Sequence, residues 1–222
     1  MISNPPLTLL EEFLLLAFDE QTGQLHPLDP DALNCAIAGA VLMDLSLRNR
    51  VDSDLRDMFP VDPTPIGDEL LDPVLKLMSM APVLTPHPIT YWLHQVAEQS
   101  SSLREKAMHR LEKRGVLHSR GFGFFWMFGG QRHLTVDEPK VRDVRSRLLS
   151  TLYSDEVPSP RNIMLTGLVD SCGLFSYLLN DTEMRDAKAR IEKISHMDLI
   201  GQAVAKGITG AGPSFSAASG NI

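Results

Sequence analysis

The stretch Asp31-Ala-Leu-Asn-Cys-Ala-Ile-Ala-Gly-Ala-Val-Leu-Met-Asp-Leu-Ser-Leu-Arg-Asn-Arg50 decides the fold class of this 222-residue chain. Between Cys35 and Met43 it carries no polar side chain, so a helix formed here has no solvent-facing side. Such a helix must be buried, either in a protein core or in a bilayer. A bilayer-spanning helix needs about 20 predominantly apolar residues, and Asp44 interrupts the run well before that length. We therefore interpret the stretch as the central helix of a helical domain.

Capping and breaking residues outline the elements around this helix. Thr8 and Glu11 have capping-box spacing and predict a helix start at Thr8, and Asp29 is expected to cap the central helix. Prolines predict irregular structure over 52–65. Further helices are expected at 67–80, 89–99, 102–114, 141–152, 163–179, 181–194 and 198–205. The sequence thus predicts one mainly α-helical domain over 7–206, with amphipathic helices around the apolar one, between a disordered lead (1–6) and tail (207–222).

The charge of the chain is unevenly distributed along its length. The net charge is −7, but residues 104–147 hold 11 Lys and Arg against 5 Asp and Glu, a net of +6. The remainder holds 10 against 23, a net of −13. Such segregation suggests one basic face that meets a polyanion, and the alternative is a set of solvated helix faces.

An aromatic segment lies inside the basic region. Five of the chain's fourteen aromatic residues fall within seven positions, and glycines flank and interrupt them, which favours a projecting β-hairpin at about 117–134. The apolar residues of this segment are Phe122, Phe124, Phe125, Trp126, Met127 and Phe128. They could form core, pack on a second copy of the chain, or insert into a membrane interface. In the membrane interpretation, the candidates for lipid phosphate contacts are Arg104, Arg110, Arg114, Arg120 and Arg132.

Several function classes lack sequence support. The chain has no GxSxG, P-loop or HExxH motif and no paired CxxC, so no catalytic constellation, cofactor or metal site is expected. Cys35 and Cys172 are expected to be buried thiols in a reducing compartment, and the first residues do not form a signal peptide. A winged-helix DNA binder is disfavoured because the chain is acidic and its hairpin apolar, so no nucleic acid partner is expected.

Five segments, in this order, resemble the Golgi phosphoprotein 3 family and its bacterial members. They are Leu7–Leu16, Gly39–Arg50, Gly67–Asp72, Ile89–Leu93 and Leu111–Leu117. The resemblance implies an almost all-helical fold and a hydrophobic hairpin that inserts into membranes and supports self-association. Eukaryotic members bind phosphatidylinositol 4-phosphate on the cytosolic face of the Golgi, where they act as adaptors that retain membrane enzymes.

The family's phosphoinositide ligands are only partly present in this chain. Of four ligand positions, one matches Arg104, whereas the others fall on or near Asp29, Ala38 and Ser101.

Together these observations predict a cytoplasmic, non-enzymatic protein that associates peripherally with anionic membrane, at the Golgi cytosolic face if the source is eukaryotic. Its expected partners are anionic lipid, including phosphatidylinositol 4-phosphate, a membrane-protein cargo and a second copy of the chain. The alternative is a protein–protein module whose hairpin drives homo-oligomerisation and whose lipid specificity is lost.

Overall fold

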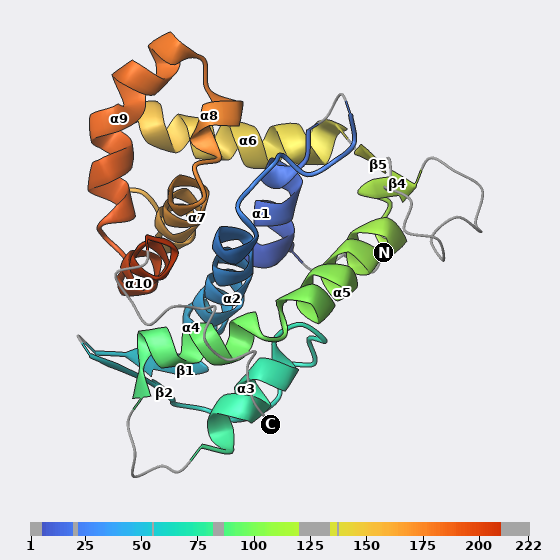
Figure 1. Cartoon of the computed structure of the whole chain (residues 1–222), viewed down its shortest axis with the longest axis vertical. Helices are drawn as coiled ribbons and strands as arrows, with labels where there is room; N and C mark the ends of the chain where they lie inside the picture. The colour runs from blue at the N-terminus through green and yellow to red at the C-terminus, as the bar shows by residue number, and fades with distance from the viewer. Residues whose placement is uncertain are drawn as a thin grey trace.

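A computed structural model describes residues 6–19, 22–54, 56–81, 87–119, 134–136 and 138–209 (Figure 1). This part of the chain is mainly helical, which confirms the predicted fold class. Its helices are α1 (Leu9–Ala17), α2 (Pro30–Leu47), α3 (Asp72–Ser79), α4 (Ile89–Ala97), α5 (Ser100–Lys113), α6 (Glu138–Tyr153), α7 (Pro160–Ser171), α8 (Phe175–Leu178), α9 (Asp181–Ser195) and α10 (Leu199–Ile208). Its strands are β1 (Val51–Ser53), β2 (Asp57–Pro60), β3 (His87–Pro88), β4 (Leu117–Ser119) and β5 (Leu134–Val136).

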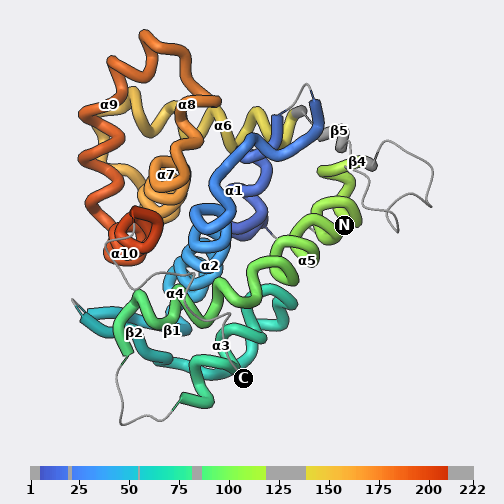
Figure 2. Tube along the Cα trace, viewed as in Figure 1, coloured from blue at the N-terminus to red at the C-terminus, as the bar shows by residue number. Residues whose placement is uncertain are grey.

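Helix α2 is the centre of the fold, as its sequence predicts. It packs against α1, α4, α5, α7 and α10, with α6–α10 on one side and α3–α5 on the other (Figure 2). Asp29 caps it as expected, because its carboxylate accepts hydrogen bonds from the backbone N–H groups of Asp31 and Ala32. By length and composition α2 could also cross a membrane, but other parts of this structure bury 72% of it.

A glycine allows α10 to lie close against α2. A Cβ atom added at Gly39 would lie 2.5 Å from Val204 Cγ2 and 3.4 Å from Leu168 Cδ2. Both neighbours are completely buried, so neither can move out into solvent. The small side chain at position 39 therefore sets the distance between two helices of the core.

A three-stranded antiparallel sheet lies where the sequence predicts irregular structure. β2 pairs with β1 and β3, with Asp52 opposite Phe59 and Met58 opposite His87. The buried indole of Trp92 on α4 donates a hydrogen bond to the Met58 carbonyl at 2.8 Å and ties the sheet to the helical core. The prediction was wrong here because strands of two to four residues are too short to show an alternating pattern.

Several helix boundaries differ from their predictions, and three of these differences have a local structural basis. Helix α5 begins at Ser100, two residues before its predicted start, without a side-chain cap, and the Ser100 hydroxyl donates a hydrogen bond to Asn34 of α2. The helix expected over 163–179 is divided into α7 and α8 at Gly173, whose φ is +66°. Helix α3 starts only at Asp72, because that carboxylate accepts the backbone N–H groups of Ile66 and Gly67 and holds this segment in a turn.

The two ends of the predicted hairpin pair as antiparallel strands. Ser119 of β4 lies opposite Leu134 of β5, so the segment between these two residues begins and ends at neighbouring positions. In Figure 1 this place lies near the end of α5 (green) and the start of α6 (yellow). A small second core anchors it, consisting of Leu15, Phe18, Leu111, Val116, Leu117 and Val141.

Candidate functional site

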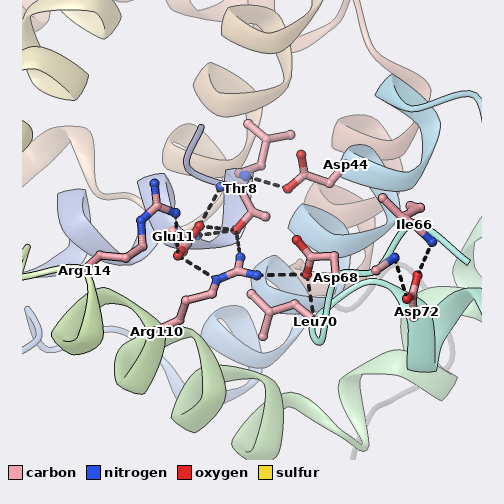
Figure 3. A network of polar contacts seen from close by, with 11 residues as sticks. Thr8, Glu11, Asp44, Ile66, Asp68, Leu70, Asp72, Arg110 and Arg114 are labelled. Atoms are coloured by element: carbon pink, nitrogen blue, oxygen red, sulfur yellow. Dashed lines mark hydrogen bonds and ion pairs between the residues drawn. The ribbon is translucent and has the colours of Figure 1, made fainter. Parts of the chain in front are cut away.

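The first turn of α1 holds a carboxylate that is completely enclosed by the protein. Thr8 and Glu11 form the predicted capping box, in which each side chain bonds the other residue's backbone N–H. Glu11 is also an acceptor for Arg110 of α5, whose Nε lies 2.9 Å from Glu11 Oε1 (Figure 3). Because the Glu11 side chain has 0% exposure, its charge needs these partners.

Arg110 connects α1 to the loop before α3. Its Nη1 donates to Asp68 Oδ1 at 2.9 Å, and its Nη2 donates to Thr8 Oγ1 at 3.2 Å (Figure 3). Burial alone lowers the pKa of the Arg110 guanidinium, but the hydrogen bond and charge of Glu11, together with Asp68, outweigh burial and raise that pKa. Arg110 therefore stays charged and holds three segments together.

Glu12, the neighbour of Glu11, is paired with two other helices. Arg147 of α6 places Nη2 2.7 Å from Glu12 Oε1, and Arg161 of α7 donates from Nε to Glu12 Oε2 at 3.2 Å. Arg161 also donates to the Leu7 carbonyl and lies 3.5 Å from Asp44. The two adjacent carboxylates of α1 thus bind arginines from α5 on one side and from α6 and α7 on the other.

Asp44 is the buried acid of α2, and its Oδ2 accepts a hydrogen bond of 2.6 Å from the backbone N–H of Leu9 (Figure 3). Burial raises the pKa of its carboxyl to about 6, against the opposing effects of the Leu9 N–H, Arg161 and Arg48. The nearby Glu12 charge adds to the increase. Asp44 therefore binds the start of α1 while remaining close to protonation near neutral pH.

Three of the predicted lipid contacts are described, Arg104 and Arg110 on α5 and Arg114 directly after it. Arg110 and Arg114 are one turn apart, and Arg114 Nη1 is 3.5 Å from Glu11 Oε1. Arg104 is half-buried and lies six residues before Arg110, about 240° around the helix. The structure thus brings Arg110 and Arg114 together and turns Arg104 away from them.

The remaining predicted site residues lie outside the described residues. These are Arg120 and Arg132 of the expected phosphate contacts, and Phe122, Phe124, Phe125, Trp126, Met127 and Phe128 of the expected hairpin.

Two cavities flank Arg114 and share it together with Pro6. The first, of about 440 Å³, is also lined by Arg48, Asp68 and Arg110. The second, of about 410 Å³, lies among α1, α5, α6 and α7, and Val116 beside β4 contributes to its wall. We call the second one the root cavity. Its charged lining consists of Glu12, Arg114, Lys140, Asp143, Arg147 and Arg161.

The four positions that the family resemblance assigns to phosphoinositide ligands carry a single cation in this chain. Asp29 is acidic, and its carboxylate caps the start of α2. Ala38 is fully buried in the core. Ser101 is exposed near the start of α5. Arg104 is therefore the one cation among these four described positions.

The sequence interpretation missed Arg147, Arg161 and Lys140 as members of a site. It predicted the capping box of Thr8 and Glu11, which is confirmed, but it predicted no arginine partner for Glu11 or Glu12. The available signal was their position in the apolar run Leu9–Phe18, because two carboxylates in a buried helix must be paired. Within the described ranges, no group of three or more His, Cys, Asp or Glu side chains could hold a metal ion.

Comparison with known proteins identifies the family of this chain. The family model of Golgi phosphoprotein 3 (GPP34) matches residues 9–210. The chain is 30% identical over 198 residues to vacuolar protein sorting-associated protein 74 of Eremothecium gossypii, covering 79% of this chain and 56% of that protein. It is 26% identical over 172 residues to the protein of the same name from Schizosaccharomyces pombe, covering 68% and 50%. The chain thus spans about half the length of these relatives, and it belongs to the Golgi phosphoprotein 3 family.

Proposed function

We propose that this protein associates peripherally with anionic membranes and works there as a non-enzymatic adaptor. The aromatic segment between β4 and β5 inserts into the membrane interface, and the basic residues around it contact lipid phosphates. The observation that carries the proposal is the pairing of Ser119 with Leu134 beside the basic end of α5. Both ends of the segment therefore meet near cations of α5 and α6.

Membership of the Golgi phosphoprotein 3 family supports a membrane role. The expected phosphate contacts are Arg104, Arg114, Arg120 and Arg132, each adding on the order of 1 kcal/mol near an anionic surface. Arg110 belongs to the same basic helix, but Glu11 and Asp68 already balance its charge. We expect Arg110 to contribute mainly by holding α5 in place. By the family resemblance, phosphatidylinositol 4-phosphate at the Golgi is the lipid to test first, and a membrane protein is the expected cargo.

Vesicle co-sedimentation tests this proposal. The wild type and the double variant Phe125→Asp/Trp126→Asp are mixed with phosphatidylcholine vesicles, with vesicles that also contain phosphatidylserine, and with vesicles that also contain phosphatidylinositol 4-phosphate. We expect the wild type to pellet with the anionic vesicles and the variant to remain in the supernatant. A further gain with the phosphoinositide would indicate head-group preference.

A matched control separates insertion from added negative charge. Tyr153 and Val157 are exposed apolar residues away from β4 and β5 in the sequence, so Tyr153→Asp/Val157→Asp adds the same charge elsewhere. This control should pellet nearly as well as the wild type, and circular dichroism should show all three proteins folded. If the wild type stays in the supernatant with all three kinds of vesicle, the membrane proposal is overturned. Sedimentation velocity of the Phe125→Asp/Trp126→Asp variant then tests the alternative role of the segment in homo-oligomerisation.

A further inference from the structure

We propose that the root cavity is a phosphate-binding site, separate from the four positions of the family's phosphoinositide pocket. None of the residues at those positions lines it. Its volume of about 410 Å³ lies within the range of small-ligand sites, roughly 300–1,000 Å³. The site itself does not depend on the membrane proposal; only a lipid as the source of the phosphate rests on that proposal.

The charges that line the root cavity favour an anion. Among the described residues, its wall holds four basic side chains, from Arg114, Lys140, Arg147 and Arg161, and two acidic ones, from Glu12 and Asp143. Glu12 and Asp143 lie in the wall itself, and Arg114 and Arg161 also face Glu11 and Asp44 outside it, each at 3.5 Å. A phosphate in the cavity would meet Lys140 and Arg147 as well, and it could accept hydrogen bonds from several converging N–H groups, which is the arrangement that basic side chains provide for phosphate.

Arg147 has donors that the protein does not use. Its Nη2 lies 2.7 Å from Glu12 Oε1, close enough for an ion pair, but the direction of the N–H does not make a hydrogen bond. Its Nε is also buried without an acceptor. A buried donor without a partner costs about 1–3 kcal/mol, so an oxygen-rich anion that reaches this guanidinium would be stabilised by it.

The first cavity offers less to an anion. Its Arg48 Nε is also buried without an acceptor, but among the described residues three basic side chains there face two acidic ones. Its Arg110 already donates from Nε, Nη1 and Nη2 to Glu11, Asp68 and Thr8. Asp68 and Glu69 also line it and would repel an anion. The phosphate is therefore assigned to the root cavity, although the two cavities have similar volumes.

The location of the root cavity suggests how phosphate binding serves the protein. Val116 in its wall directly precedes β4, and Lys140 lies in the first turn of α6, just after β5. A phosphate held there would join α5 to α6 at the base of the paired strands. A lipid headgroup or a soluble phosphate can supply this chemistry, and the two sources are separable by experiment.

Two exposed residues of the lining allow a test, because their substitutions should change the phosphate affinity in opposite directions. Lys140→Gln removes a positive charge and Asp143→Asn removes a negative one, and neither residue is buried. Isothermal titration calorimetry with inorganic phosphate and with glycerol 3-phosphate measures affinity at constant ionic strength. We expect Lys140→Gln to weaken binding and Asp143→Asn to strengthen it, each by about two- to fivefold, the effect of one exposed charge pair. Lys188→Gln, on the exposed face of α9, is the matched control and should change nothing.

The same three variants are then sedimented with vesicles of phosphatidylcholine alone and with phosphatidic acid. In the expected charge order, Lys140→Gln binds more weakly than the wild type and Asp143→Asn binds more tightly. If soluble phosphate binding follows this order and no vesicles are bound, the result supports the cavity and refutes the membrane proposal. Vesicle binding that follows the charge order, without soluble binding, supports a lipid as the source. If neither soluble phosphate nor vesicle binding responds to Lys140→Gln and Asp143→Asn, the root cavity is not a phosphate site, even where Phe125→Asp/Trp126→Asp abolishes membrane binding.

Discussion

Arg110 Nε donates to Glu11 Oε1 over 2.9 Å and thereby joins two residues that are 99 positions apart in the chain. The pair connects the first turn of α1 to α5, the helix that leads into β4. Glu11 is fully buried and Arg110 nearly so, with 17% of its side chain exposed. Removing one partner of such a pair leaves the other charge buried, which is costly.

We predict that Arg110→Gln lowers the free energy of unfolding by about 2–4 kcal/mol. The expected loss is at the lower end of the range for buried pairs because Arg114 remains 3.5 Å from Glu11. Urea denaturation followed by circular dichroism measures the change. The exposed Arg56 supplies a control, since Arg56→Gln should cost less than about 0.5 kcal/mol. Equal stability of the two variants would contradict a structural role for the pair.

Asp44 is expected to make stability depend on pH in the opposite direction from an ordinary paired carboxylate. Its folded-state pKa is about 6, above the ordinary value of 3.8, so the folded protein binds its proton more tightly than the unfolded chain does. Stability from this residue is therefore greatest below pH 4 and falls as pH rises from about 4 to 6. The total effect is on the order of 2–3 kcal/mol.

Asp44→Asn removes this titration while keeping the size of the side chain. We expect the stability of the wild type, relative to the variant, to decline between pH 4 and pH 7 by that amount. Urea midpoints at several pH values measure this difference, and the subtraction cancels carboxylates whose pKa is lowered, such as Asp54 and Asp62. A difference that stays constant over this range would show that burial does not control the Asp44 carboxyl.

The close approach of α10 to α2 predicts coupling between Gly39 and Val204. Gly39→Ala places a methyl group 2.5 Å from Val204 Cγ2, and overpacking of this kind costs about 1–3 kcal/mol. Val204→Ala removes that methyl but leaves a cavity when made alone. In the double variant the new methyl occupies part of that space, so we expect less destabilisation than the sum of the single changes, by about 1 kcal/mol. Strict additivity in a double-mutant cycle would contradict the packing.

Local chemistry explains which parts of the fold could be predicted from the sequence. Thr8, Glu11 and Asp29 bond backbone groups within three residues, so their spacing is sufficient to identify the helix starts. The absence of polar residues in the centre of α2 predicts its burial without knowledge of its neighbours. These predictions are confirmed because they depend on short stretches of chain.

The parts that could not be predicted depend on contacts distant in sequence. Helix α5 begins without a side-chain cap at Ser100, whose hydroxyl donates to Asn34, 66 residues away. The root cavity gathers Glu12, Arg147 and Arg161 from three helices, and none of the three has a motif that indicates the others. Pairing of a buried acid can be expected from its burial, but the identity of the partner cannot.

The salt dependence of vesicle binding tests the central claim of membrane association most directly. Wild-type protein is sedimented with phosphatidylserine-containing vesicles while sodium chloride rises from about 0.05 M to about 0.5 M, which shortens the screening length severalfold. We predict that the affinity falls by at least about tenfold, because several basic residues contribute through screened charge. The account is contradicted if the protein does not bind anionic vesicles at low salt. It is also contradicted if the affinity stays constant or increases as the salt concentration rises.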